Sequence, residues 1–398
     1  MKASFKIALV CLGMAGLALA AESAQADVTL NGSGSSAGRQ FAGLAPAFLC
    51  DAGTATFFTD GLVPPTDSEF QCVRGGNQAT FRYHASGSSD GYTKQTASWP
   101  QTELFLNSAT STCANAGSPV AVGPVSVQTK VCSVVVKASM PVHYGASDVV
   151  NTSFHFTNIS ASGVSTNPVV SVPFSFAVGA NVRQYDTNGT TLINLKSLTR
   201  EEVEMIYSGN VTDWTTLGYN VSAGSSTISL CERTNGSGTK ATLDEVVLIN
   251  ADESTTPNVP QSGSSGNMKT CLQNNLNSIG YIDADTTLAG GSYYIGLDGT
   301  NAPTGTTASK KAIRCGKYPF WANWNIIRRT ANLDTLAGVA PGTNAALNAL
   351  IDSMQNNNPL PGFWMQLFFV APQDAFVLKN DDKGPLVPTG GGETVCRG

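Results

Sequence analysis

Four short segments, far apart in the chain, combine glycine with serine or threonine and constrain the fold more than any other feature. They lie at residues 30–36, 87–91, 145–148 and 233–239. Glycine lets the backbone turn and approach a ligand closely, while serine and threonine add hydroxyl donors. A helix that begins directly after such a turn presents unpaired N–H groups and the positive end of its dipole. We therefore interpret the four segments as parts of an oxyanion-binding site.

The N-terminus has the pattern of a cleaved secretory signal peptide over residues 1–26. Two lysines precede an apolar run at 7–20, and a small-x-small site follows at 24–26. The mature protein is therefore predicted to leave the cytoplasm. We favour the periplasm, and the leader by itself leaves export to the exterior open.

Nine cysteines occur, and only Cys11 lies within this leader. The even number that remains in an exported chain favours disulfides over metal ligation. No pair has C-x-x-C spacing and the histidines form no zinc pattern, so we expect no metal and no cofactor. Neighbours in sequence suggest four pairs, although eight cysteines permit many other pairings. The suggested pairs are Cys50 with Cys72, Cys113 with Cys132, Cys231 with Cys271, and Cys315 with Cys396.

Charge and length limit the possible partners. The net charge is −5, and only 13% of the residues are charged. An acidic protein has no long-range field that would gather nucleic acid or anionic lipid, so we exclude nucleic acid as a partner. Any bound anion must be held by local groups. The length is sufficient for two domains with separate cores, and no stretch after the leader is apolar enough to span a bilayer.

Strand-like runs are separated by helix-like stretches in both halves, which predicts an α/β fold. The runs rich in β-branched and aromatic residues are 79–84, 131–137, 169–178, 227–231 and 324–328. Helices are predicted after a capping box at Thr199 and over 344–354, where apolar residues recur every three or four positions. Two Ser/Thr/Gly/Pro-rich segments, 252–267 and 290–309, are predicted surface loops.

In this order and with these neighbours, the four segments resemble those of the periplasmic phosphate-binding proteins that serve high-affinity phosphate ABC importers. The resemblance covers most of the mature chain in pieces, and it implies a monomer with a type 2 periplasmic-binding-protein fold. Such a fold has two lobes, a hinge and an interlobe ligand cleft. Lobe one would comprise 27–175 and 320–398, with an insert at about 92–143, and lobe two 176–319. The implied partners are inorganic phosphate and the membrane permease of an ABC importer.

The resemblance also implies roles for residues of lobe one. L-N-G-S-G-S-S-A at 30–37 is similar to the family's L-[TN]-G-[AS]-G-[AS]-[TS], so Ser36 would donate its hydroxyl and Ala37 its backbone N–H. The family usually has an aromatic residue where Ala37 stands, and backbone donation survives that change. Y-H-A-S-G-S-S-D-G at 83–91 is similar to Y-x-x-x-G-S-S-x-G and places Ser88 at the anion.

The remaining two segments supply the charged groups. G-A-S-D at 145–148 implies that Asp148 is the buried carboxylate that accepts the phosphate's own proton. R-T-N-G-S-G-T at 233–239 is similar to R-x-D-G-S-G-T, so Arg233 would be the cationic clamp. A nest at a helix start would be formed by Ser237, Gly238 and Thr239. Asn235 stands where the family has an aspartate that pairs with the arginine.

Two other functions remain open. One is a secreted enzyme of phosphate metabolism, but the sequence shows no metal cluster and no base beside Ser36 or Ser88, so we predict no catalytic residue. The other is a binder of a different oxyanion, or a secreted scaffold. The insert at 92–143 and the departures at Ala37 and Asn235 motivate that alternative.

Overall fold

The computed structural model describes residues 27–62, 64–155, 157–249, 253, 258–303, 307–356, 377–379, 382, 386–388 and 396. The predicted leader, residues 1–26, lies outside the described residues. Within the described part, no helix is long and apolar enough to cross a membrane.

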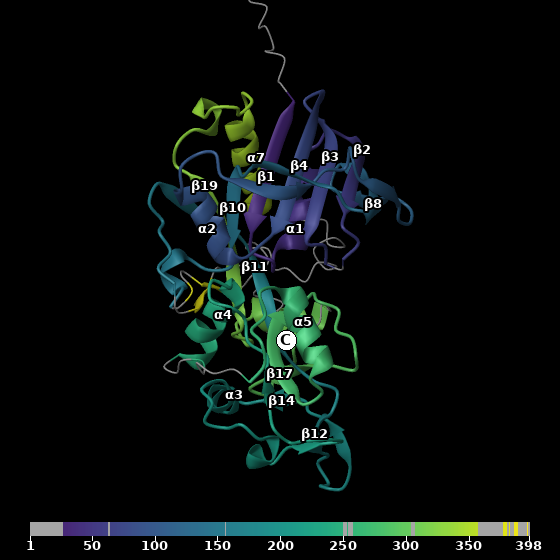
Figure 1. The fold of residues 1–398 in the computed structure, drawn as a ribbon, viewed down its shortest axis with the longest axis vertical. Helices are drawn as coiled ribbons and strands as arrows, with labels where there is room; N and C mark the ends of the chain where they lie inside the picture. Colours follow the sequence, from purple (N-terminus) through teal and green to yellow (C-terminus); the bar gives the residue numbers. More distant parts are fainter. Residues whose placement is uncertain are drawn as a thin grey trace, which may run out of the picture.

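The molecule is elongated, with an upper and a lower body joined by one long strand, β11 (Val164–Val178) (Figure 1). The elements of the upper body are β1 (Val28–Gly34), α1 (Arg39–Leu44), η1 (Ala45–Leu49), β2 (Gly53–Thr59), β3 (Asp67–Arg74), β4 (Asn77–Ala85), α2 (Ser88–Thr96), β5 (Thr102–Leu106), β6 (Thr112–Asn115), β7 (Val120–Val122), β8 (Val125–Val134), β9 (Lys137–Pro141), β10 (Tyr144–Ser147), η2 (Asn151–Ser153), β19 (Trp321–Arg329), η5 (Leu333–Thr335) and α7 (Thr343–Asn356).

The lower body is formed by the middle of the chain. Its elements are β12 (Val182–Tyr185), β13 (Leu192–Asn194), β14 (Ser197–Leu198), α3 (Arg200–Tyr207), η3 (Trp214–Leu217), β15 (Asn220–Val221), β16 (Ser229–Leu230), α4 (Gly238–Leu243), η4 (Asp244–Leu248), α5 (Ser265–Asn274), β17 (Ser278–Asp283), β18 (Tyr293–Leu297) and α6 (Thr307–Arg314). A hairpin of β20 (Val377–Lys379) and β21 (Leu386–Pro388) follows late in the chain.

One β-sheet connects the two bodies. Its main strand order, in the residues described, is β14-β18-β11-β19-β10-β1-β4-β3-β2-β8-β6, with β17 also pairing to β11. Strand β1 lies between β4 and β10 and is parallel to both, so that Gly34 is in register with Ala85 and Ala146. Parallel strands end at the same edge of a sheet. The three Gly/Ser segments of the upper body therefore lie side by side.

Strand β11 changes partners where it passes between the bodies. Val164–Pro173 pairs with β19 of the upper body, whereas Phe174–Val178 pairs with β17 and β18 of the lower body. The rings of Phe174 and Phe176 pack on Phe320, and the Tyr318 hydroxyl donates to the Phe174 carbonyl at 2.9 Å. Within the described residues, this aromatic crossing is the one place in the sheet where both bodies share a strand.

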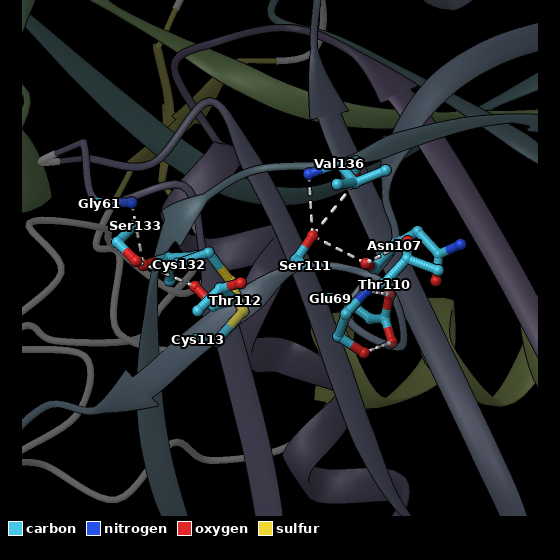
Figure 2. Close-up of a disulfide and its surroundings, with 12 residues drawn as sticks. Gly61, Glu69, Asn107, Thr110, Ser111, Thr112, Cys113, Cys132, Ser133 and Val136 are labelled. Carbon is cyan, nitrogen blue, oxygen red and sulfur yellow. Dashed lines mark hydrogen bonds between the residues drawn. A yellow bond between two sulfur atoms is a disulfide. The ribbon is translucent and has the colours of Figure 1, made fainter.

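Residues 92–143 both extend the sheet and bond to one another. Strand β8 pairs in parallel with β2, while β5 pairs with β9. Figure 2 shows the Cys113–Cys132 disulfide between β6 and β8, and Ser111 nearby, whose hydroxyl donates to the Asn107 carbonyl at 2.8 Å and accepts from the Val136 N–H at 2.9 Å. All four cysteine pairs suggested by the sequence are formed.

Several expected elements are confirmed, and two predicted loops are partly wrong. The capping box of α3 is complete: Thr199 Oγ1 accepts from the Glu202 N–H at 3.2 Å, and Glu202 accepts from the Thr199 N–H at 2.7 Å. The predicted surface loop 290–309 contains the strand β18, whose Ile295 and Leu297 are buried against β11. The strand consists of five residues, Y-Y-I-G-L. The sequence on both sides is rich in Ser, Gly and Thr, and this composition led to the prediction of a loop.

A close glycine contact fixes α2 against the end of β10. A Cβ atom on Gly145 would overlap the carbonyl oxygen of Gly91, and a Cβ atom on Gly91 would overlap the backbone of Ala146. Only glycine at both positions allows this approach of helix and strand. The start of α2 is thereby held beside residues 145–148.

We expect Gly145→Ala to lower the free energy of unfolding by roughly 1–3 kcal/mol, because backbone must move to make room for the methyl group. Gly266→Ala is the matched control: Gly266 is exposed in α5, and its added Cβ meets nothing closer than the Ser264 hydroxyl at 3.6 Å. That variant should be unchanged or more stable by about 0.5–1 kcal/mol. Urea unfolding followed by tryptophan fluorescence measures both, and equal effects would contradict the packing argument.

Candidate functional site

The ends of β1, β4 and β10 bring together three of the predicted site residues. Ser36 follows β1, Ser88 begins α2 after β4, and Asp148 follows β10. Their exposed fractions are 6%, 1% and 2%. The upper body thus presents two hydroxyls and one carboxylate toward the lower body.

Asp148 is held by two serine hydroxyls. Its Oδ1 accepts from the hydroxyl of Ser35, and its Oδ2 accepts from Ser88 Oγ at 3.0 Å. Burial raises the pKa of Asp148 to about 7, and the negative charge of Asp283 acts in the same direction, against the opposing effects of the two hydroxyls and of Arg233. The carboxyl is therefore a buried group that can exchange a proton near neutral pH.

Arg233 faces this carboxyl from the lower body. Its Nε donates to the Ser262 carbonyl at 3.2 Å, its Nη1 donates to Ser265 Oγ at 3.3 Å, and its backbone N–H donates to the Tyr281 hydroxyl at 3.0 Å. The side chain is buried, and burial lowers the pKa of its guanidinium, whereas the charges of Asp283 and Asp148 raise it. The positive charge of Arg233 lowers the pKa of Asp148, against the effect of burial.

The two bodies touch through these segments. Ser36 Oγ and Ser265 Oγ are 3.0 Å apart, and the Ser89 N–H donates to the Gly236 carbonyl at 3.0 Å. A Cβ atom on Gly238 would lie 2.7 Å from Asp148 Oδ2, so the start of α4 approaches the carboxylate as only glycine permits. All four Gly/Ser segments therefore meet at one interlobe position.

The remaining predicted residues lie at the start of α4 and in the loop after β1. Ser237 caps α4, because its Oγ accepts from the Lys240 N–H at 3.3 Å, and Thr239 is buried in the first turn of that helix. The Ala37 N–H donates to Ser35 Oγ at 3.1 Å. Contact of these three residues with an anion stays a prediction.

Sequence reasoning missed two serines at the site, Ser35 and Ser265. Ser265 lies in residues 262–266, S-G-S-S-G, which were predicted to be part of a surface loop. That prediction is wrong for Ser262 and Ser265, which are 3% and 0% exposed, because Ser262 pairs with Arg233 and Ser265 opens α5. The composition of 262–266 matches that of the other four segments, and this signal could have identified it as a fifth.

The raised pKa of Asp148 predicts a pH-dependent stability. Because an unfolded aspartate has a pKa of about 4, the folded state binds this proton more tightly. The stabilising contribution is complete below about pH 4 and is lost as the pH rises to about 7. In phosphate-free buffer we expect the wild type to lose about 2–4 kcal/mol more than Asp148→Asn between pH 4.5 and 7.5, measured by urea unfolding. Asp51→Asn, at an exposed turn, should retain the wild-type pH dependence; a wild-type pH profile for Asp148→Asn would contradict the shift.

Comparison with solved structures finds matches at low sequence identity. A phosphate transport receptor from Vibrio cholerae is 14% identical, with 86% of this chain and 100% of that chain covered and a TM-score of 0.46. A phosphate-binding protein from Stenotrophomonas maltophilia is 12% identical, with 90% and 92% covered and a TM-score of 0.44. No curated protein matches the sequence.

A family model gives the assignment. The model of the PBP superfamily domain matches residues 137–352, more than half of the chain. The match contains the Asp148 segment, the whole lower body and the strand β19. The chain belongs to the PBP superfamily, and its α/β architecture is the type 2 periplasmic-binding-protein fold.

Proposed function

We propose that this protein is an exported receptor that captures inorganic phosphate between its lobes and delivers it to the membrane permease of an ABC importer. The observation that carries the proposal is the approach of two segments from different lobes: Gly238 lies against Asp148, and Ser265, which accepts from Arg233, lies 3.0 Å from Ser36. In this proposal the protein is a periplasmic monomer with lobes at 27–175 plus 320–398 and at 176–319. The partner switch of β11 at Pro173 and Phe174 supplies the hinge.

Dipoles would carry most of the affinity. A phosphate dianion that faces one arginine and one aspartate is not charge-balanced, so hydroxyls, backbone N–H groups and a helix start must stabilise it. The proposed donors are Ser36, Ala37, Ser88, Arg233, Ser237, Gly238 and Thr239. Charge-assisted hydrogen bonds contribute about 1.5–3 kcal/mol each, so half a dozen could support micromolar or tighter binding, roughly −8 kcal/mol.

Asp148 in its ionised form, which prevails above its pKa of about 7, would determine which oxyanion is accepted. Monohydrogen phosphate has a proton to donate to a carboxylate, whereas sulfate at neutral pH has none. A site built around one hydrogen bond can reject an analogue that lacks it by roughly 10⁴ to 10⁵. Arsenate keeps the proton and should be rejected poorly. The Ser35 and Ser88 hydroxyls, which donate to the two carboxylate oxygens, support this orientation of Asp148 as an acceptor.

The enzyme alternative is not part of the proposal. Ser88 has a carboxylate beside it, which the sequence did not show, but its hydroxyl also accepts from the Asp148 N–H at 3.3 Å. A nucleophile needs a base that is itself oriented toward the reaction. Asp148 accepts from Ser35 as well as from Ser88, and in the proposal it accepts the proton of the bound anion, so no serine is assigned as a nucleophile.

Isothermal titration of the mature, phosphate-stripped protein tests the proposal. We expect one-to-one binding of phosphate at micromolar Kd or tighter and no measurable binding of sulfate at pH 8. Arg233→Gln should weaken phosphate binding by about 10- to 150-fold, since one charge-assisted contact is lost. Asp148→Asn should bind sulfate, because its amide can donate to an anion that has no proton.

The titrations have a matched control variant and an outcome that would contradict the proposal. Asp51→Asn should leave both titrations unchanged, since Asp51 accepts from the Gly75 and Gly76 N–H groups at an exposed turn. A folded wild-type protein, verified free of phosphate, that binds neither anion would overturn the proposed function. Equal affinity for phosphate and sulfate would instead favour a general oxyanion binder.

Delivery to a permease requires a test in cells. We expect deletion of the gene in the source cell to reduce uptake of radiolabelled phosphate at micromolar concentrations, and the wild-type gene to restore it. The Arg233→Gln gene should restore uptake only at higher phosphate concentrations, because loading of the receptor then limits transport. Unchanged uptake after deletion would contradict the delivery step.

A further inference from the structure

A second buried arginine lies next to the first Gly/Ser segment. Arg39 begins α1, three residues after Ser36, and is 5% exposed. A guanidinium carries five N–H donors, and buried donors are normally hydrogen-bonded. Among the residues described, Arg39 Nη1 has an ion-pair contact of 3.7 Å with Asp283 Oδ2, and its Nε has no hydrogen-bond partner. A 3.7 Å contact is too long for a hydrogen bond, so this guanidinium is weakly held for a buried cation.

Asp283 is equally under-bonded and lies in the other lobe. It ends β17, two residues after Tyr281, whose hydroxyl accepts from the Arg233 N–H. The side chain is buried, and neither of its carboxylate oxygens has a hydrogen-bond partner in the described structure. The Arg39–Asp283 pair therefore joins the two lobes beside the candidate site without filling the hydrogen-bonding capacity of either group.

The charges of this pair affect the pKa values of Asp148 and Arg233. Burial raises the pKa of Asp148 and the charge of Asp283 adds to that shift. Burial lowers the pKa of Arg233, the charge of Asp283 opposes that shift, and the positive charge of Arg39 reinforces it. Burial also raises the pKa of Asp285 to about 7, with the charge of Asp283 acting in the same direction and that of Arg39 opposing it. Two guanidiniums and three carboxyl groups, those of Asp148, Asp283 and Asp285, are thus electrostatically linked between the lobes.

We propose that Arg39 is a second anion-binding guanidinium of the interlobe site, and that Asp283 is the shared counter-charge of Arg39 and Arg233. The inference rests on the proposed function and extends its ligand set. It also accounts for Asn235: the acidic partner that the motif lacks at that position is supplied from β17. Two cations then face the anion, one from each lobe, so that binding itself draws the lobes together.

A different role for the same pair is an interlobe latch that never contacts the ligand. The two roles predict opposite effects at Asp283. If Arg39 binds the anion, neutralising Asp283 removes a negative charge from the site and releases Arg39, so phosphate affinity is retained or increased. If the pair is only a latch, loss of Asp283 opens the lobes as loss of Arg39 does, and both changes weaken binding.

Titration of phosphate into the mature, phosphate-stripped chain distinguishes these roles. We expect Arg39→Gln to weaken phosphate binding by about 10- to 150-fold, Arg39→Lys to weaken it less, and Asp283→Asn to bind phosphate at least as tightly as the wild type. Arg328→Gln is the matched control, because Arg328 bonds Ser165 and Asn348 within the upper body and should bind phosphate like the wild type. Circular dichroism and a thermal melt verify that each variant is folded.

Each outcome decides the inference. Weaker binding by both Arg39→Gln and Asp283→Asn would establish the latch and overturn the proposal. Wild-type affinity in Arg39→Gln, with weakened binding in Arg233→Gln, would also overturn it while leaving the phosphate receptor intact. A wild-type protein that binds no phosphate would overturn both. If Arg39→Gln does not fold, Arg39→Lys and Asp283→Asn decide: weaker binding by the lysine variant with retained or tighter binding by the asparagine variant supports the proposal, and any other combination overturns it.

Discussion

The parallel pairing of β1 with β4 and β10 is the constraint on which the rest of the site depends. It aligns Gly34 with Ala85 and Ala146, so three segments that are distant in sequence leave the sheet at one edge. Each segment then turns into a loop or helix with few bulky side chains. The Gly91–Gly145 contact keeps α2 close to β10, and Ser88 reaches Asp148 for that reason. A shift of one register position would separate these groups.

Strand β11 gives the second lobe its position relative to this edge. Because one continuous strand pairs with β19 and then with β17, the lobes share backbone hydrogen bonds without sharing a rigid interface along their whole length. The lobes also meet through the His155–Glu245 contact and through an apolar cluster that includes Ala241 and Phe154. The contacts at the candidate site itself are small or polar: Ser36 with Ser265, Ser89 with Gly236, and Gly238 against Asp148. Such contacts are individually weak, so an anion bound among them can determine whether the lobes close.

Burial of charged side chains is the feature of this site that costs the most folding free energy. An ionised carboxylate or guanidinium in a low-dielectric interior is strongly disfavoured unless it is paired and hydrogen-bonded. Asp148 has a raised pKa and accepts hydrogen bonds from two serine hydroxyls. Arg233 donates to the Ser262 carbonyl and to the Ser265 hydroxyl. Arg39 and Asp283 have one loose ion pair between them. Buried charged groups that lack hydrogen bonds lower the free energy of unfolding. A ligand that supplies the missing hydrogen bonds stabilises the folded protein when it binds.

The sequence by itself determined the α/β class, the α3 cap and the four Gly/Ser segments, because these depend on local patterns along the chain. It suggested the four disulfide pairs that the structure forms but left other pairings open. It did not reveal β18, whose five residues are concealed by their polar neighbours, or Ser265, whose segment has the same composition as an exposed loop. Nor could it pair Arg39 with Asp283, which are separated by most of the chain and meet only across the lobes. Local chemistry specified which residue types can bind an anion; only the tertiary structure, through strand order and lobe closure, decided which of them share one buried volume.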